Sequence, residues 1–221
     1  MDFSLLQTIA LAAIPVVLAI TMHEAAHGYV ARQFGDSTAW MLGRVTLNPL
    51  KHIDPIGTVL VPLGILLLSG GGLLFGWAKP VPVNFGNLRH PKRDMLWVAI
   101  AGPGVNFVMA LIWALLFGLA AGNGVFASAG LQYMSLIGVG INVALMVLNL
   151  LPILPLDGGR IAVSLLPHSL AMPFARTERF GFFIVIALLV TGVLGVAMRP
   201  LIRVVTSLIQ ALTGVSLPGV F

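Results

Sequence analysis

The chain lacks cysteine and carries very little charge. Its 221 residues include no Cys, and only 9% are Asp, Glu, Lys or Arg, whereas 58% are hydrophobic. Without cysteine there is no disulfide framework and no thiolate metal site, so a metal would have to be held by His, Asp or Glu. The scarcity of charge, together with a mean hydropathy of +1.03, excludes an ordinary soluble domain. The composition indicates a polytopic membrane protein.

The few charges are also unevenly placed. No charged residue lies between Phe3 and Met22, and the twelve Lys and Arg stand mainly in short connections between apolar runs. A net charge of +5 would favour nucleic-acid binding in a soluble protein. Basic connections orient membrane helices, however, so we expect a lipid bilayer and no nucleic acid as partner. The first apolar run is followed by Arg32, Arg44 and Lys51. By the positive-inside rule, these basic residues place the end of that run toward the cytoplasm. The run has no basic start and no small-residue cleavage site, so we expect it to remain as a helix.

Long apolar runs predict the membrane helices. We expect one helix from about Ser4 to Arg32, a second from Met95 to Ala121 and a third from Leu131 to Leu151. In the second of these, Asn106 is a polar group at membrane depth that needs a partner. The run from Phe180 to Met198 should cross outward. The segment 201–212 should form an amphipathic helix in the interface or on the bundle.

Two weaker regions are interrupted by proline and glycine. Residues 56–69 are apolar but contain Pro62 and Gly64, are short for a span, and have basic residues on both sides. The charge rule favours a re-entrant segment here, and the alternative is an ordinary tilted span. Residues 44–47 and 73–83 are predicted to be extended chain, which could add a strand to a bound substrate.

The first predicted helix carries two imidazoles and a carboxylate near its end, at His23, Glu24 and His27. On a helix, His23 and His27 lie one turn apart on the same face, the geometry in which two imidazoles share one Zn²⁺ ion. Glu24 lies beside them, where it can take a proton from a metal-bound water. The pattern also arises by chance on soluble helices. At membrane depth, however, each ionisable residue costs about 2.5 to 3.5 kcal/mol, and a metal would offset that cost.

A second chemical pattern ends the third predicted helix, between Asn149 and Arg160 (NLLPILPLDGGR). Pro152 and Pro155 interrupt helical hydrogen bonding, which hydrocarbon penalises unless the unwound chain is buried in protein or lines a wet cavity. An Asp before Gly-Gly is ordinarily a turn residue, but in this place Asp157 is a candidate third metal ligand. Two His and one carboxylate leave the fourth zinc position for water.

In combination these motifs resemble the site-2 protease family of intramembrane zinc metalloproteases, in a short form without PDZ or CBS domains. The resemblance spans about Ile20 to Arg160 and includes the Ala101-Gly102-Pro103 motif of the middle helix. It implies a catalytic core of three transmembrane helices, with Glu24 as general base and Asn149 as an oxyanion-stabilising residue. It also implies one zinc ion per chain, held by His23, His27 and Asp157.

We therefore expect an all-α polytopic membrane protein with a three-helix catalytic core, short extended or re-entrant segments and about two further C-terminal helices. Residues 1–221 should form a single membrane-embedded domain, with the core at about 4–160 and the C-terminal helices at about 161–221. The expected activity is hydrolysis of peptide bonds within or near transmembrane segments of membrane-protein substrates. We expect a multi-pass protein of the prokaryotic cell (inner) membrane, with its active site nearer the cytoplasmic face.

Two other classes of function share some of these features. Intramembrane His and Asp residues also mark ion pathways, so a metal or proton transporter is the alternative. A transporter has no need of a base fixed beside two ligands, and Glu24 therefore favours the protease. A silent scaffold that binds membrane helices is disfavoured because every position of the catalytic pattern is filled. His52, His90 and His168 have no second ligand at helical spacing, and we expect them to be solvated loop residues.

Overall fold

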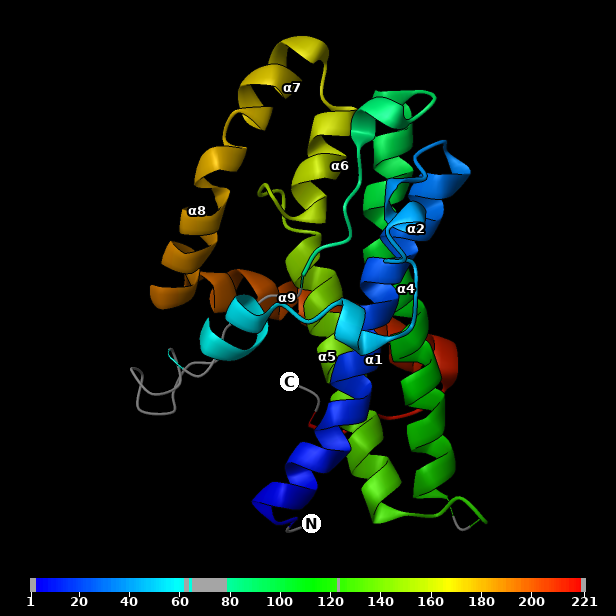
Figure 1. Ribbon diagram of the computed structural model, residues 1–221. Coiled ribbons are helices and arrows are strands. Elements are labelled where there is room, and N and C mark those ends of the chain that lie inside the picture. Colours follow the sequence, from blue (N-terminus) through cyan, green and yellow to red (C-terminus); the bar gives the residue numbers. More distant parts are fainter. Residues whose placement is uncertain (1–2, 62–63, 65–78, 123, 220–221) are drawn as a thin grey trace.

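The computed structural model describes residues 3–61, 64, 79–122 and 124–219, which form a helical multi-pass membrane protein without an assigned strand (Figure 1). Within these residues, four helices are long and apolar enough to cross a bilayer. They are α1 (Leu5–Gln33), α4 (Pro91–Ala121), α5 (Ala129–Asn149) and α9 (Val193–Thr213). The shorter helices are α2 (Thr38–Met41), η1 (Pro49–Lys51), η2 (Pro55–Leu60), η3 (Phe85–Asn87), α6 (Asp157–Leu165), α7 (His168–Ala175) and α8 (Glu178–Val190). The expected all-α membrane class is confirmed.

The ends of α1 follow from local sequence. Ser4 caps the helix by accepting the backbone N–H of Gln7, whose side chain accepts the N–H of Ser4 in return. The helix stops before Gly35, which has φ +114°, a backbone conformation that residues with a Cβ rarely adopt. The predicted first helix is thus correct to within one residue at each end.

Helices α1, α4 and α5 lie side by side and form the core of the bundle (Figure 1). Helices α4 and α5 run in opposite directions, and between them lies the main cluster of buried apolar side chains, including Trp113, Phe117, Val139 and Val143. The ring of Trp113 rests directly on Gly138, because a Cβ there would lie 2.3 Å from the ring. Small residues of this kind allow close helix approach in a membrane.

The C-terminal part differs from the sequence prediction. The expected continuous helix from Phe180 to Met198 is wrong, because α8 ends at Val190 and Gly192, with φ +75°, turns the chain into α9. The thirteen residues of α8 reach only about 20 Å, which is short of a bilayer. Figure 1 shows α9 crossing behind the bundle, where its buried Ile202 and Ile209 join the core cluster of α4 and α5.

The two weaker regions of the sequence remain only partly described. Residues 44–47 contain bends and no strand, so the extended segment predicted there is wrong. Of the 73–83 segment, residues 79–83 are described as irregular chain, and 73–78 lie outside the described residues. Residues 55–60 form η2, but most of 62–69 lies outside the described part, so the re-entrant segment stays a prediction.

Candidate metal centre

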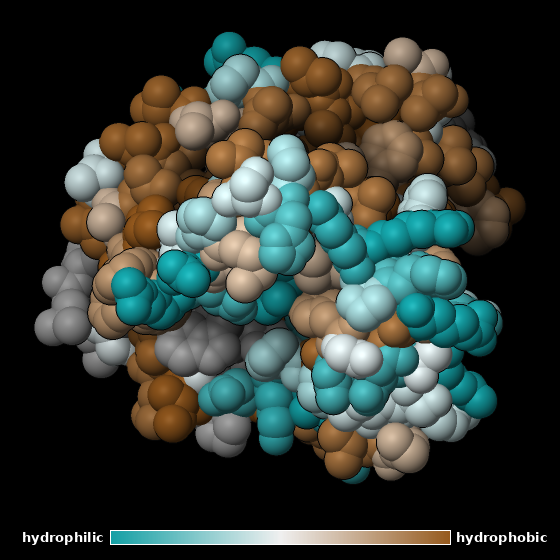
Figure 2. All heavy atoms as spheres, turned by 90° about the horizontal axis from the view of Figure 1, so that it is seen from above, coloured by the Kyte–Doolittle hydropathy of each residue, from teal (hydrophilic) through white to brown (hydrophobic). Residues whose placement is uncertain are grey.

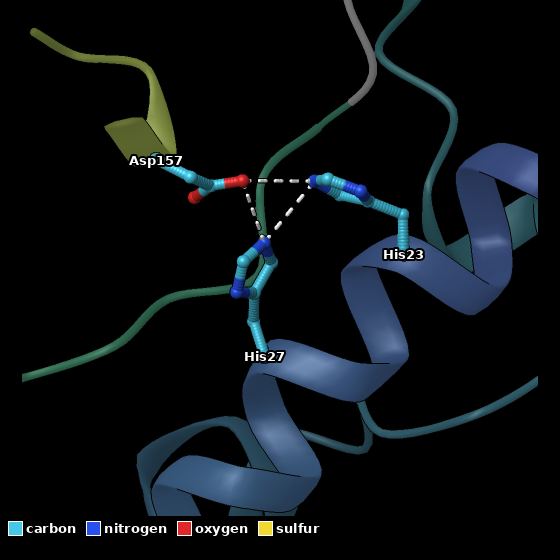
Figure 3. A group of neighbouring side chains, drawn as sticks. All are labelled: His23, His27 and Asp157. Atoms are coloured by element: carbon cyan, nitrogen blue, oxygen red, sulfur yellow. Dashed lines mark hydrogen bonds and ion pairs between the residues drawn. The ribbon is translucent and has the colours of Figure 1, made fainter. Parts of the chain in front are cut away.

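The structure brings His23, His27 and Asp157 together, although 130 sequence positions separate the second histidine from the aspartate. Both imidazoles project from α1 toward the Asp157 carboxylate at the start of α6 (Figure 3). The two Nε2 atoms are 3.1 Å apart, and Asp157 Oδ2 lies 3.3 Å from His23 Nε2 and 3.4 Å from His27 Nε2. Among the described residues, these three form the one group of three or more His, Asp or Glu side chains close enough to hold a metal ion.

Asp157 reaches this position because the chain unwinds between two helices. Helix α5 ends at Asn149, the loop contains a cis Leu154–Pro155 peptide, and α6 begins at Asp157 itself. The loop wraps closely over the start of α6, since a Cβ on Gly158 would lie 2.3 Å from the carbonyl oxygens of Leu150 and Leu151. The glycine after Asp157 therefore belongs to the geometry of the site, and the aspartate is more than a turn residue.

The ring nitrogens on the far side of each imidazole have fixed partners. His27 Nδ1 lies 2.7 Å from the backbone carbonyl oxygen of Val98, and His23 Nδ1 lies 2.5 Å from Asn106 Oδ1. Both partners are acceptors, so each Nδ1 carries the hydrogen and each Nε2 presents a lone pair to the centre. Asp157 Oδ2 is buried and accepts no conventional hydrogen bond from any residue that the structure describes. Three electron-rich atoms thus converge without a donor between them.

Helix α4 supplies the second wall of the centre through residues spaced four apart. Val98 provides the carbonyl for His27, Asn106 provides the amide oxygen for His23, and Gly102 lies between them on the same face. A Cβ on Gly102 would lie 2.3 Å from His27 Nε2 and 2.7 Å from His23 Nε2. Only a residue without a side chain leaves the two Nε2 atoms accessible at this point.

These distances fit a tetrahedral zinc ion. With ligand bonds of about 2.05 Å, neighbouring ligand atoms of a tetrahedral site are about 3.3 Å apart. The three observed separations of 3.1, 3.3 and 3.4 Å match that edge. The donor set of two neutral imidazoles and a carboxylate is also that of a catalytic zinc site with its fourth position open. The residues present therefore fit Zn²⁺ without rearrangement.

Glu24 lines the same cavity as the three candidate ligands. Its Oε2 accepts the backbone N–H of Val81 at 2.6 Å, which leaves Oε1 available. The segment around Val81 is itself held by Arg44, a buried guanidinium whose Nη2 donates to the carbonyl oxygens of Lys79 at 2.8 Å and Pro80 at 3.2 Å. In the sequence prediction Arg44 was a charge that orients the chain and the start of an extended segment, so its part in holding the loop beside Glu24 was missed.

The centre opens into a cavity of about 790 Å³ whose walls are largely apolar. Its lining comes from α1, α4, α5, the 150–156 loop, α6, α8 and the chain at 80–85. Asn149 lines this cavity, and its Nδ2 donates to the carbonyl oxygen of Leu145 at 3.0 Å. An amide nitrogen carries two hydrogens, so one of them is still available to a group in the cavity.

The other histidines lie away from the centre. His90 and His168 are exposed, as expected, although His168 is the first residue of α7 and not a loop residue. His52 is buried, with Nε2 3.0 Å from the carbonyl oxygen of Thr46, so the expectation of a solvated side chain is wrong there. The backbone carbonyl of His52 also accepts the N–H of Lys79 at 2.9 Å, which joins this residue to the segment beside Glu24.

One polar residue of the site was missed entirely in the sequence. Asn142 on α5 is fully buried and hydrogen-bonded to Asn106. A polar side chain within the apolar run of α5 is a signal of the same kind as Asn106, since an unpartnered amide at membrane depth is costly. The same reasoning applied to this helix would have identified it.

The chain was compared with known proteins. Residues 117–192 match the model of peptidase family M50. A Bacillus subtilis protein named "Putative zinc metalloprotease YwhC" is 40% identical over 194 residues, covering 86% of this chain and 84% of the relative. "Putative zinc metalloprotease Rip2" of Mycolicibacterium smegmatis is 33% identical over 184 residues, covering 80% of this chain and 66% of the relative. The Rip2 protein of Mycobacterium tuberculosis is 29% identical over 148 residues, and this chain spans about half of its length (52%). No solved structure is significantly similar.

The helical membrane fold and the His-His-Asp centre define a membrane-embedded zinc metalloprotease. The chain belongs to peptidase family M50, the site-2 proteases, which confirms the resemblance drawn from the motifs. Zn²⁺ is its metal. The transporter alternative receives no support from the family or from the relatives.

Proposed function

We propose that this metalloprotease cleaves peptide bonds within or near the transmembrane segments of membrane proteins. In this proposal His23, His27 and Asp157 hold the zinc ion, Glu24 is the general base and Asn149 donates to the oxyanion. The observation that carries the proposal is the place of the His-His-Asp group, which lies on a helix long and apolar enough to cross a bilayer and opens into a large apolar cavity. A cavity of this size and polarity suits an apolar peptide segment.

The depth of the group follows from its position along α1. At 1.5 Å per residue, His23 lies about 27 Å from the start of α1 at Leu5 and about 15 Å from its end at Gln33. The hydrocarbon core of a bilayer is about 30 Å thick. A group at this level would lie inside the bilayer, nearer the end of α1 at which the chain continues toward α2.

Charge supports a cytoplasmic position for that end. Arg32 is in the last turn of α1, and Arg89, Lys92 and Arg93 stand at the start of α4, which lies at the same end of the bundle. Figure 2 views the molecule from this end and shows hydrophilic residues gathered over its middle, with hydrophobic residues along much of the rim. The opposite connection between α4 and α5, residues 122–128, contains no charged residue. By the positive-inside rule, the proposed active site is nearer the cytoplasm of a prokaryotic cell membrane.

Each residue has a definite task in the proposed reaction. When bound, Zn²⁺ supplies a Lewis acid that polarises the scissile carbonyl and makes water easier to deprotonate. Glu24 takes the water proton at Oε1, while Val81 holds Oε2, and later delivers the proton to the leaving amine nitrogen. Asn149 donates its second amide hydrogen to the developing oxyanion. The apolar cavity wall excludes bulk water from the peptide bond.

The substitution Glu24→Gln tests the proposal, because it removes the base and leaves all three ligands in place. Membranes from cells that express the wild type or the variant are compared by mass spectrometry of membrane-protein fragments, and purified protein is assayed for zinc. We expect the variant to retain zinc and to lose the fragments. Glu178→Gln is the matched control, because Glu178 is the other glutamate of the chain and forms a partly exposed ion pair with Arg160.

The two parts of the proposal fail in different ways. Fragments that persist at the wild-type level in Glu24→Gln would exclude Glu24 as the base. Fragments that depend on Glu24 but come only from soluble segments would refute the transmembrane substrate class and leave the metalloprotease standing.

A further inference from the structure

Two buried asparagines form a hydrogen-bonded chain that leads away from the metal centre. Asn106 on α4 and Asn142 on α5 are both completely buried at the depth of the helices that would cross the bilayer. Buried amides at this depth are costly unless every donor and acceptor is paired, and such residues usually serve a function.

The bonds of this chain run in one direction. Asn106 Oδ1 accepts the Nδ1 hydrogen of His23. Its Nδ2 donates to the carbonyl oxygen of Ala19 at 3.3 Å and to Asn142 Oδ1 at 2.8 Å. Asn142 Nδ2 in turn donates to the carbonyl oxygen of Gly138 at 2.8 Å. Because that backbone carbonyl can only accept, it fixes the orientation of Asn142, and Asn142 helps to fix that of Asn106.

The two imidazoles of the centre are held in different ways. His27 donates to the backbone carbonyl of Val98, which can only accept and cannot rotate. His23 faces a side-chain amide, which presents either an oxygen or an NH₂ group after a half-turn. If Asn106 turned its NH₂ toward His23, the imidazole would have to accept at Nδ1, and its hydrogen would move to Nε2. A hydrogen on Nε2 occupies the lone pair that a metal ion needs.

We propose that Asn142 is a positioning residue that sets the tautomer of His23 through Asn106. It has hydrogen bonds with Asn106 and Gly138 and with neither histidine. Its Oδ1 accepts from the Asn106 amide and holds the Asn106 oxygen toward the imidazole. This inference rests on the proposed ligand set. Asn142 is not itself a ligand: it lies on a third helix and orients the ligand His23 before metal binds.

The experiment compares Asn142→Leu with Asn142→Asp in the purified full-length chain. A leucine cannot accept from Asn106, whereas an aspartic acid buried at this depth stays protonated, accepts through its carbonyl oxygen and donates its O–H to Gly138. Ser135→Ala is the matched control, because Ser135 is a fully buried polar residue on the same helix whose hydroxyl has no hydrogen-bond partner among the described residues. Zinc affinity is measured by competition with a chelator, and the tautomer of His23 by ¹⁵N NMR of the metal-free protein.

We expect zinc to bind about tenfold more weakly to Asn142→Leu, as for the loss of a residue that orients a metal ligand. Asn142→Asp and Ser135→Ala should bind zinc as the wild type does. The NMR signal of His23, assigned by its absence in His23→Gln, should show hydrogen on Nδ1 in the wild type and partly on Nε2 in Asn142→Leu. If the leucine variant does not fold, Asn142→Ala gives the same comparison with a smaller side chain.

Two outcomes would overturn the inference. Wild-type zinc affinity and an unchanged tautomer in the apolar variant would show that Asn142 does not act on His23. Equal losses of zinc affinity in Asn142→Leu and Asn142→Asp would show that the packing of Asn142 matters and that the direction of its hydrogen bonds does not. Full zinc binding by His23→Gln would be a different failure, because it would refute the proposed ligand set itself.

Discussion

Replacement of Gly102 by alanine is the most specific steric test of the metal centre. Gly102 lies on α4 between the residues that hold the two imidazoles. The added Cβ would lie 2.3 Å from His27 Nε2 and 2.7 Å from His23 Nε2, whereas ordinary contacts begin at 3.4 Å. The methyl group would therefore occupy space next to both candidate ligand atoms, and α1 and α4 or the imidazoles would have to move.

The size of this movement predicts the size of the effect. The shortest contact falls about 1 Å below an ordinary one, and metal ligands tolerate errors of only about 0.2 Å. Overpacking of this kind costs about 1 to 3 kcal/mol of stability, part of which is offset by the better helix propensity of alanine, about 0.5 to 1 kcal/mol. We thus expect a folded protein whose zinc affinity and kcat/KM both fall by at least about 100-fold.

The assay measures zinc per chain by mass spectrometry after equilibration with a zinc buffer, and helix content by circular dichroism. Gly104→Ala is the control, because it makes the same change two residues further along α4, where a Cβ would meet no atom of the described part of the chain within 4 Å. The control should bind zinc fully. Stoichiometric zinc at wild-type affinity in Gly102→Ala would refute the steric argument and the ligand geometry on which it depends.

Three further predictions follow from the surroundings of the site. Arg44→Leu should retain zinc but lower kcat/KM by about tenfold, because the carbonyls of Lys79 and Pro80 lose the donor that holds this segment, whose Val81 N–H positions Glu24. Arg44→Lys should recover part of the loss. Asn149→Ala should retain zinc and thermal stability while kcat falls by about 10² to 10³, and a variant that instead loses zinc would make Asn149 a scaffold residue. Burial would raise the pKa of Asp36, but donors from Thr38, Asn84 and Asn87 hold that pKa below its ordinary value. Its contribution to stability is therefore complete above about pH 4 and is lost as the pH falls through the lower, folded-state pKa. Thermal unfolding at pH 3 to 5 should show this loss in the wild type and not in Asp36→Asn.

The sequence predicted the three core helices because each is a long, largely apolar run with a clear stop. The prediction failed where an apolar run favoured a continuous helix but a glycine within it ended the helix. The run from Phe180 to Met198 is apolar throughout, so hydropathy predicted one helix, yet Gly192 adopts a positive φ and divides it. Whether an interior glycine ends a helix depends on what the two halves pack against. Here α9 packs on α4 and α5, which no local pattern encodes.

In the candidate site, too, the local sequence predicted the type of each ligand but not the distant residues that orient it. Ligand chemistry is local, so His23 and His27 could be paired from their spacing and Asp157 from its motif. The groups that orient these residues come from distant segments, such as the carbonyl of Val98 and the amide of Asn142. A backbone carbonyl has no sequence signature at all. A buried asparagine has one, but its direction is visible only when its partners are known.

Two histidines on one helix do not by themselves form a metal site at membrane depth. The stripe of Val98, Gly102 and Asn106 on α4 supplies what they lack. Each imidazole must donate its Nδ1–H in a hydrogen bond to a protein acceptor, because no water is present in hydrocarbon to accept it. Helix α4 supplies one acceptor from its backbone and one from a side chain, and between them it leaves a gap without a side chain. All three contributions require α4 to approach α1 closely, and the absence of a side chain at Gly102 permits that approach. The close approach of the two helices therefore sets three things at once: the histidine tautomers, the separation of the two Nε2 atoms and the space beside them. A loss of packing between α1 and α4 should thus weaken zinc binding before it unfolds the bundle.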